Sequence, residues 1–141
     1  MDKLYIVMPA YNEQDTIEDV VKSWYEVLKV ASDDSRLVIA DSGSTDRTHD
    51  ILLSLKNKLP KIVILSDTIK YHGPKLIAMY KYAIKEGSDF IFQTDSDGQT
   101  NPEEFYNFWN ERKDYDAILG YRKVRGDGII RKFMNEPFHI E

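Results

Sequence analysis

Asp95 and Asp97 stand one residue apart, directly after the apolar run Phe90-Ile91-Phe92. In an extended segment, side chains two positions apart point the same way, so the two carboxylates would converge on one small volume. Like charges held that close are unfavourable without a proton or a cation between them. Mg²⁺ or Mn²⁺ suits this place, because hard divalent ions bind carboxylate and phosphate oxygens. The pair therefore predicts a metal site that holds a diphosphate.

Two other classes of protein place carboxylates at this spacing. An EF-hand loop would have Gly98 and Glu104 at the right offsets, but Gln93 replaces its first Asp and the preceding segment reads as a strand. An aspartyl phosphatase would carry the pair after its first strand, with a Thr two positions beyond the second Asp. This chain has Gln99 there. Aspartyl phosphatase remains an alternative function at this point.

Apolar runs alternate with amphipathic segments along the chain, which indicates an α/β fold with a mostly parallel central sheet flanked by helices. Strands are expected at Leu4–Met8, Leu37–Ala40, Ile62–Leu65, Phe90–Gln93 and Ala117–Leu119. Helical stripes of apolar residues are expected within Ile17–Leu28, Ile51–Leu59, Leu76–Ile84 and Phe105–Trp109. Asn12 is expected to cap the first helix, and Asn101, before Pro102, the last.

In parallel sheets, ligands bind beyond the carboxyl ends of the strands. The loops that carry most of the polar chemistry all follow expected strands or can reach that edge: Pro9–Glu13, Asp41–Asp46, His72–Lys75, Asp95–Gln99 and Gly120–Arg122. Their convergence on one edge is stronger evidence for a site there than any single motif.

Several side chains in these loops suit a nucleotide. Tyr11 could stack on a base, and Glu13 could accept hydrogen bonds from a sugar or base, although this loop could equally just start a helix. Asp41 could accept a hydrogen bond from a base N–H, and Gly43 allows a turn with positive φ. Lys75, near a helix N-terminus, could contact phosphate, or it could be a solvated lysine.

The end of the chain is locally basic. Arg122, Arg125 and Arg131 could clamp phosphates or form a solvated face. The segment Gly126–Gly128 predicts a flexible loop that would suit a lid. The concentration of basic residues at this end of the chain suggests that it faces phosphate or a membrane surface, including peripheral membrane contact.

Length, charge and cysteine content limit the functions that this chain could have. The chain has 141 residues, a formal net charge of -5 and no cysteine. No basic footprint for nucleic acid is visible, and disulfides and zinc thiolate sites are excluded. The apolar run Leu4–Met8 is too short to span a bilayer. We expect a single cytoplasmic domain over residues 1–141, which could lie at the cytoplasmic face of a membrane.

Three motifs together resemble the family 2 glycosyltransferases with the GT-A (Rossmann-like) fold. They are the segments Ile6–Glu13, Asp41–Asp46 and Asp95–Asp97, the last being a DXD motif. The resemblance runs from about Leu4 to Arg131, and the ending Ala117–Arg122 is similar to the polyprenyl-phosphate (dolichol-phosphate) sugar synthases. It implies a UDP- or GDP-linked sugar donor and a polyprenyl-phosphate or saccharide acceptor.

The resemblance also implies residue roles. A nucleoside pocket would be lined by Pro9, Tyr11 and Glu13, with Asp41 at the base. Asp95 would lie by the ribose or the metal, and Asp97 would bind the metal that stabilises the departing nucleoside diphosphate. Phosphate groups of the donor or the acceptor would face Arg122 and Arg131.

The chain departs from the family pattern in two respects. Ser42 stands where a second Asp is usual, which alters a base or ribose contact. Members of the family normally continue well beyond 141 residues, so the fold is expected to be truncated at the acceptor side and no general base is assigned. A non-catalytic nucleotide-sugar-binding module therefore remains an alternative, and surface left by the absent part would favour a homo-oligomer.

Overall fold

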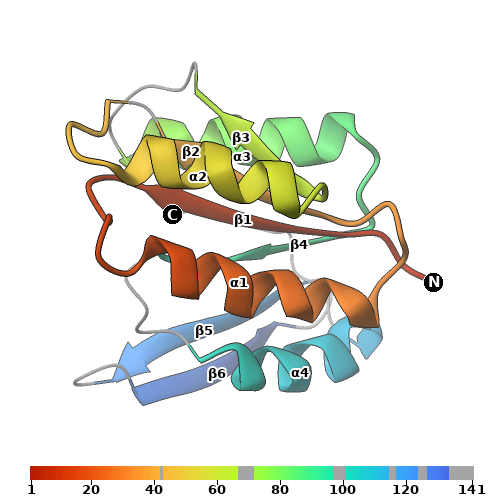
Figure 1. The fold of residues 1–141 in the computed structure, drawn as a ribbon. Coiled ribbons are helices and arrows are strands. Elements are labelled where there is room, and N and C mark those ends of the chain that lie inside the picture. The colour runs from red at the N-terminus through yellow and green to blue at the C-terminus, as the bar shows by residue number, and fades with distance from the viewer. Residues whose placement is uncertain (42, 67–71, 97–100, 115–116, 124–126, 134–141) are drawn as a thin grey trace. The chain divides into compact units, whose positions relative to one another are not determined.

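The structure, a computed structural model, describes residues 1–41, 43–66, 72–96, 101–114, 117–123 and 127–133 (Figure 1). The chain divides into two compact units, Met1–Gly98 and Gln99–Glu141.

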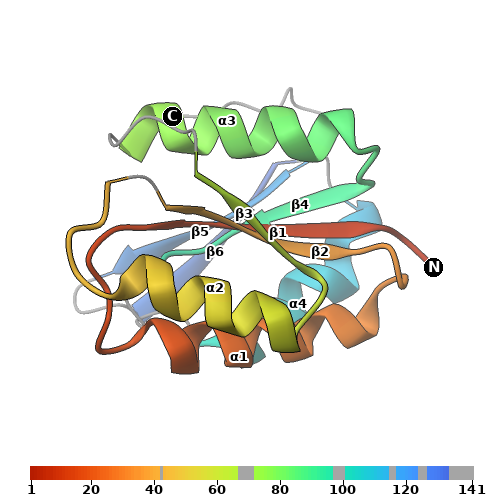
Figure 2. The ribbon, with the colours of Figure 1, turned by 45° about the horizontal axis from the view of Figure 1, so that its top comes forward.

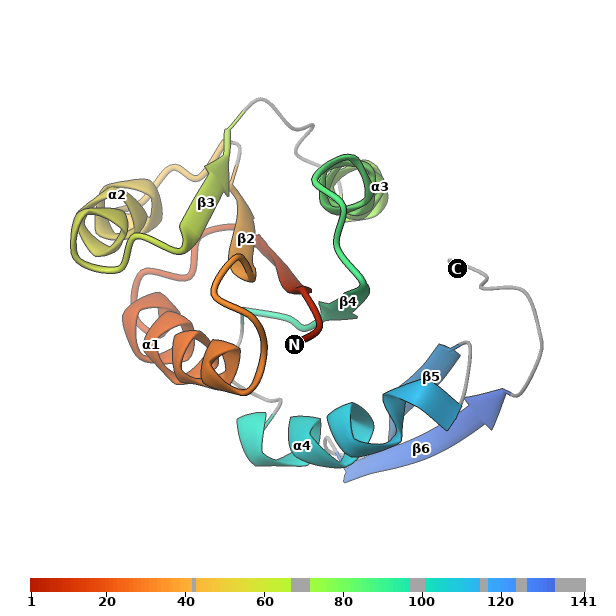
Figure 3. The same ribbon diagram turned by 90° about the vertical axis from the view of Figure 1, so that its right-hand side faces the viewer.

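A four-stranded parallel sheet forms the centre of the first unit. Its strands are β1 (Leu4–Ala10), β2 (Arg36–Asp41), β3 (Ile62–Leu65) and β4 (Phe90–Gln93), in the order β3-β2-β1-β4. The end-on view of Figure 3 shows this order across the sheet. These four strands and their parallel pairing confirm the expectation from the apolar runs.

Three helices cover the two faces of this sheet: α1 (Ile17–Val27), α2 (Thr48–Lys58) and α3 (His72–Lys85). Figure 2 shows α1 and α2 below the sheet and α3 above it. A short 3-10 helix, Leu28–Val30, extends α1. Within the described parts of the chain, no helix is long and apolar enough to cross a membrane.

Both faces of the sheet are packed, so the strands need apolar side chains on both sides. All seven residues of β1 are buried. On the α1 face, the rings of Trp24 and Phe92 lie 5.4 Å apart. On the α3 face, strands and helix share one cluster of buried residues: Tyr5, Val7, Val38, Ala40, Leu76, Met79, Tyr80 and Ala83. This double cover makes the sheet a rigid base for the loops at its edge.

The start of α1 differs from the sequence expectation. Asn12 does not cap the helix; its backbone adopts φ 49°, and Thr16 is the residue before the first helical turn. The carbonyl of Glu13 accepts hydrogen bonds from the backbone N–H groups of Thr16 (3.1 Å) and Ile17 (2.8 Å). The backbone itself closes the first turn, so the side chain of Asn12 is not needed as a cap and can form hydrogen bonds with the neighbouring loop.

The second unit contains α4 (Pro102–Glu111), a 3-10 turn (Arg112–Asp114) and two strands, β5 (Ala117–Lys123) and β6 (Asp127–Phe133). Asn101 caps α4 as expected, because its side chain accepts from the Glu103 N–H at 3.0 Å. β5 confirms the fifth predicted strand, but it pairs antiparallel with β6 in a separate sheet. The sequence did not predict β6, which begins inside the expected Gly126–Gly128 loop; residue 126 lies outside the described residues.

Candidate functional site

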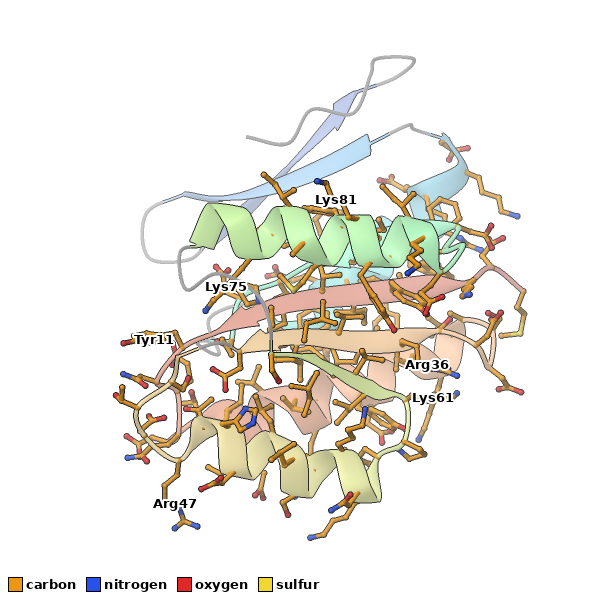
Figure 4. The ribbon with its side chains drawn as sticks, turned by 90° about the horizontal axis from the view of Figure 1, so that it is seen from above. Tyr11, Arg36, Arg47, Lys61, Lys75 and Lys81 are labelled. Atoms are coloured by element: carbon orange, nitrogen blue, oxygen red, sulfur yellow. The ribbon has the colours of Figure 1, made fainter. Side chains whose placement is uncertain are left out.

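The carboxyl edge of the parallel sheet gathers the loops that the sequence singled out. Ala10 at the end of β1 pairs with Asp41 at the end of β2, and Val7 pairs with Gln93 at the end of β4. Figure 4 shows Tyr11 and Lys75 at this edge, whereas Arg36 and Lys61 lie at the opposite end of the strands. The register therefore brings the loops after β1, β2 and β4 together.

Asp41 is the last residue of β2, and its side chain is only 1% exposed. Its Oδ1 accepts a hydrogen bond from the Ser44 hydroxyl, and its Oδ2 lies 3.2 Å from Nδ1 of His49. Gly43, which lies between Asp41 and Ser44 in the sequence, has φ 86°, as its place in the turn predicted. Burying a carboxylate is costly unless it is hydrogen-bonded, so these two contacts make the buried position of Asp41 tolerable.

Asn12 ties the loop after β1 to the loop after β2. Its N–H donates to the Ser44 hydroxyl oxygen at 3.1 Å, and its side-chain oxygen accepts from the Thr45 N–H at 2.8 Å. The small polar side chain of Asn tolerates positive φ better than most residues. The conformation of Asn12 thus turns both its backbone and its side chain toward the neighbouring loop.

Thr48 makes a second link between the same two loops. Its hydroxyl accepts from the Glu13 N–H at 2.8 Å and donates to Asp46 Oδ1 at 2.6 Å. Asp46 also accepts from the N–H groups of Thr48 (2.9 Å) and Gln14 (3.3 Å). Desolvation raises the pKa of Asp46, but these hydrogen bonds outweigh it and the net pKa lies below the ordinary value.

Lys75 is buried, with 2% of its surface exposed, so it is not the solvated lysine considered from the sequence. Its Nζ donates to the carbonyl oxygen of Ala10 at 2.9 Å and lies 5.5 Å from the centre of the Tyr11 ring. A cation over an aromatic face is attracted to the ring. Lys75 therefore connects α3 to the end of β1 and to the half-buried ring of Tyr11.

The chain after β4 is arranged differently. The Thr94 N–H donates to the Val7 carbonyl at 3.0 Å, and Asp95 is half-buried. The Thr94 hydroxyl is buried and has no hydrogen-bond partner within the part of the chain that the structure describes. Before it, the Tyr80 hydroxyl donates to Gln93 Oε1 at 2.6 Å, and burial raises the pKa of Tyr80.

Some predicted site residues are not placed at this edge by the structure. Ser42 and Asp97 lie outside the described residues. Arg122 lies in β5 and Arg131 in β6, both in the second unit. Pro9 is buried within β1, opposite Ala40. Among the described residues, no three potential metal ligands gather, and Asp95 is the one described member of the predicted metal pair.

Sequence reasoning placed Ser44 at this edge only as part of the segment Asp41–Asp46, without a role, and it missed Thr48 and His49. Ser44 and Thr48 lie in a segment rich in turn and cap residues, where hydroxyl side chains are common for structural reasons. His49 is the second residue of α2, and the sequence does not show that its side chain faces Asp41.

Solved structures share this fold. The mannosyltransferase PcManGT from Pyrobaculum calidifontis, in complex with GDP-Man and Mn²⁺, matches with a TM-score of 0.58 and 21% identity over 68% of this chain and 28% of its own. S. aureus TarS matches with a TM-score of 0.60 and 22% identity over 83% of this chain and 21% of its own. The α/β fold of this chain is thus the GT-A-like fold that the motifs predicted.

Curated relatives agree with the motifs as well. The poly(ribitol-phosphate) beta-glucosyltransferase of Bacillus spizizenii is 30% identical over 95% of this chain, which spans 21% of that protein. The undecaprenyl-phosphate 4-deoxy-4-formamido-L-arabinose transferase of Yersinia enterocolitica is 26% identical over 92% of this chain, which spans 40% of that protein. The EF-hand alternative is wrong, because Phe90–Gln93 is a strand of the parallel sheet. The sequence profile described as Glycosyl transferase family 2 matches residues 5–140, so the chain belongs to that family and not to the aspartyl phosphatases.

Proposed function

We propose that this chain forms the donor-binding part of a metal-dependent glycosyltransferase that takes a sugar from a UDP- or GDP-sugar. The observation that carries the proposal is Asp41, a buried carboxylate held by two hydrogen bonds at the carboxyl edge of a parallel sheet. A base N–H would find in it an acceptor that is already oriented, so little ordering is left for binding.

The surrounding loops suit the rest of a nucleoside. Tyr11 offers an aromatic ring, whose centre lies 5.5 Å from Lys75 Nζ, and Glu13 follows in the same loop. The hydrogen bonds of Asn12 and Thr48 hold this loop against the one that carries Asp41. Among the proteins of similar fold, TarS has been solved with UDP and PcManGT with GDP-Man, which supports a nucleoside diphosphate as the ligand here.

The donor set at the end of β4 fits a hard divalent cation. Asp95 brings a half-buried carboxylate to the edge, Asp97 is two residues further, and carboxylate oxygens are preferred by Mg²⁺ and Mn²⁺. The hydroxyl of Thr94, one position before Asp95, is buried and unpaired among the described residues. Asp95 and Asp97 would hold Mg²⁺ or Mn²⁺, which when bound would stabilise the charge of the departing nucleoside diphosphate.

For the acceptor, the proposal is a phosphate-bearing molecule, with Arg122 and Arg131 facing phosphate groups. Two relatives are named for phosphate-bearing molecules, a poly(ribitol-phosphate) and an undecaprenyl-phosphate. A lipid-phosphate acceptor would bring the protein to the cytoplasmic face of a membrane as a peripheral partner. Self-association into a homo-oligomer is part of the same proposal, and light scattering of the purified chain measures it.

Thermal unfolding with ligands tests the proposal. UDP or GDP together with Mn²⁺ should raise the stability of the chain, by about 2.7 kcal/mol when the ligand is at 100 times its Kd. Asp97→Ala should remove the metal-dependent part, whereas Asp19→Ala, an exposed carboxylate on α1, should leave it unchanged. A wild-type chain that neither nucleotide stabilises, with or without Mn²⁺, would contradict the proposal.

A second candidate is a donor-binding module without activity of its own. It is favoured by one observation: the chain spans only 21% and 40% of the two relatives described above. An assay with a panel of UDP- and GDP-sugars separates the two. Sugar transfer or hydrolysis of a donor supports the enzyme, and binding without either reaction supports the module.

A further inference from the structure

His49 contacts the buried Asp41 from a different element than Ser44 does. It lies in the first turn of α2, its side chain is 39% exposed, and its Nδ1 is 3.2 Å from Asp41 Oδ2. Ser44 reaches the other oxygen, Oδ1, from the loop after β2. The carboxylate is thus held at both oxygens, once from a helix and once from a loop.

Two contacts on opposite oxygens fix the rotation of a carboxylate about the bond to its Cβ. Each carboxylate oxygen has two lone-pair directions, and among the described residues Ser44 and His49 occupy one on each oxygen. A single contact from Ser44 would restrain this rotation less. In the tautomer with hydrogen on Nδ1, the His49 ring donates this second hydrogen bond.

We propose that His49 is a positioning residue for recognition of the donor's base. It holds the Asp41 carboxylate in the orientation that accepts the base N–H. The inference rests on the proposed function, in which Asp41 meets the base. His49 is not needed for contacts to ribose, diphosphate or metal in this scheme, so its effect is confined to ligands that carry a base.

That confinement makes the proposal testable with two ligands, measured by titration calorimetry in the presence of Mn²⁺. One is whichever of UDP and GDP the wild-type chain binds more tightly, and the other is ribose 5-diphosphate, which lacks a base. Three variants are compared: His49→Phe keeps a ring without a donor, His49→Ala removes the side chain, and His49→Asn keeps an N–H donor on a shorter side chain.

We expect His49→Phe and His49→Ala to weaken nucleotide binding about tenfold, the loss of about 1.4 kcal/mol of a well-oriented hydrogen bond. Binding of ribose 5-diphosphate should change less than about twofold, and His49→Asn should recover most of the nucleotide affinity. On an Asp41→Asn background, His49→Phe should have no further effect on nucleotide binding, because the two residues act as one unit.

Three results would overturn the proposal. Equal losses for both ligands would mean that His49 supports the loop as a whole and not the base contact. Unchanged nucleotide affinity in His49→Phe would mean that Ser44 alone suffices. If the wild-type chain binds ribose 5-diphosphate as tightly as the nucleotide, the base contact itself is absent.

A wild-type chain that binds neither ligand would refute the proposed function itself, and this outcome is distinguishable from a failure of the His49 proposal alone. Denaturant unfolding of each variant verifies that it is folded.

Discussion

β2 and β4 flank β1 in the sheet, and the polar groups that follow these two strands differ in how they are hydrogen-bonded. After β2, hydrogen bonds from Ser44 and His49 hold Asp41, and Asn12 and Thr48 tie the neighbouring loops together. After β4, the Thr94 hydroxyl is buried and, among the described residues, unpaired, next to the half-buried Asp95. One edge has its polar groups satisfied by the protein, whereas the other carries a buried polar group that the described protein atoms leave unsatisfied.

This difference teaches which part of the proposed donor site is formed before a ligand arrives. A satisfied polar network is rigid, and any ligand that uses it avoids the cost of ordering it. A buried hydroxyl without a partner costs free energy in the unliganded protein. The base side would therefore be preorganised, and the metal–diphosphate side would gain part of its order with the ligand. Four substitutions test this contrast.

Thr48→Val should have the largest effect, a loss of about 1–3 kcal/mol in the free energy of unfolding. It removes the acceptor of the Glu13 N–H and the donor to Asp46, at a fully buried position, without changing the side-chain shape. Denaturant unfolding measures it. Thr16→Val, at an exposed position whose side chain makes no capping hydrogen bond, is the control and should stay within about 0.5 kcal/mol. Equal losses in both would show that the Thr48 link is not special.

Asn12→Ala should cost about 1–2 kcal/mol, because it removes the acceptor of the Thr45 N–H and places Ala at φ 49°. Asn12→Gly loses the same side-chain bond but accepts positive φ without strain, so it should be more stable than Asn12→Ala. The comparison of the two unfolding curves separates the hydrogen bond from the backbone conformation. If Asn12→Gly were the less stable variant, positive φ would contribute nothing at this position.

Tyr80→Phe should cost about 0.5–1.5 kcal/mol at neutral pH, because it removes the hydrogen bond to Gln93 just before the β4 edge. Burial raises the pKa of Tyr80 above the model-compound value of 10.0, so the neutral hydroxyl is favoured in the folded chain. Its contribution is fully present below about pH 10 and is lost as the pH rises through the folded pKa. Unfolding curves taken from pH 8 upward should therefore fall less steeply for Tyr80→Phe than for the wild type.

Thr94→Val should have the smallest effect and the opposite sign to Thr48→Val: unchanged stability, or a gain of up to about 1 kcal/mol without ligand. It replaces an unpaired buried hydroxyl with a methyl group of similar shape, so no hydrogen bond within the described protein is lost. A loss above 1 kcal/mol would show that the hydroxyl is satisfied in solution, and the contrast between the two edges would then disappear.

Patterns of residues predicted the framework of the first unit well. The four parallel strands and the α1 stripe followed from continuous apolar runs and from helical spacing, which depend on local sequence and burial alone. β6 was missed because Asp127 and Gly128 read as turn residues, and only pairing with β5 makes that segment a strand. Long-range pairing of this kind overrides local propensity.

The candidate site was predicted in part. The strand ends placed Tyr11 and Asp41 at one edge, as the parallel sheet required. The partners of these residues could not be predicted, because a side-chain contact depends on rotamers and on the distance between loops. Lys75 shows this well: its type and place suggested a phosphate contact or a solvated lysine, and the structure buries it against Ala10 and Tyr11.

The sheet order has a consequence for the sequence of events during folding. The Leu4 N–H bonds to Ser35 across 31 positions, whereas the Lys3 N–H bonds to Asp89 across 86 positions. Closing the longer loop costs more chain entropy and needs most of the first unit to be synthesised. We therefore expect β1 and β2 to pair first and β4 to join last, so a nascent chain would acquire its Asp41 edge before its Asp95 edge.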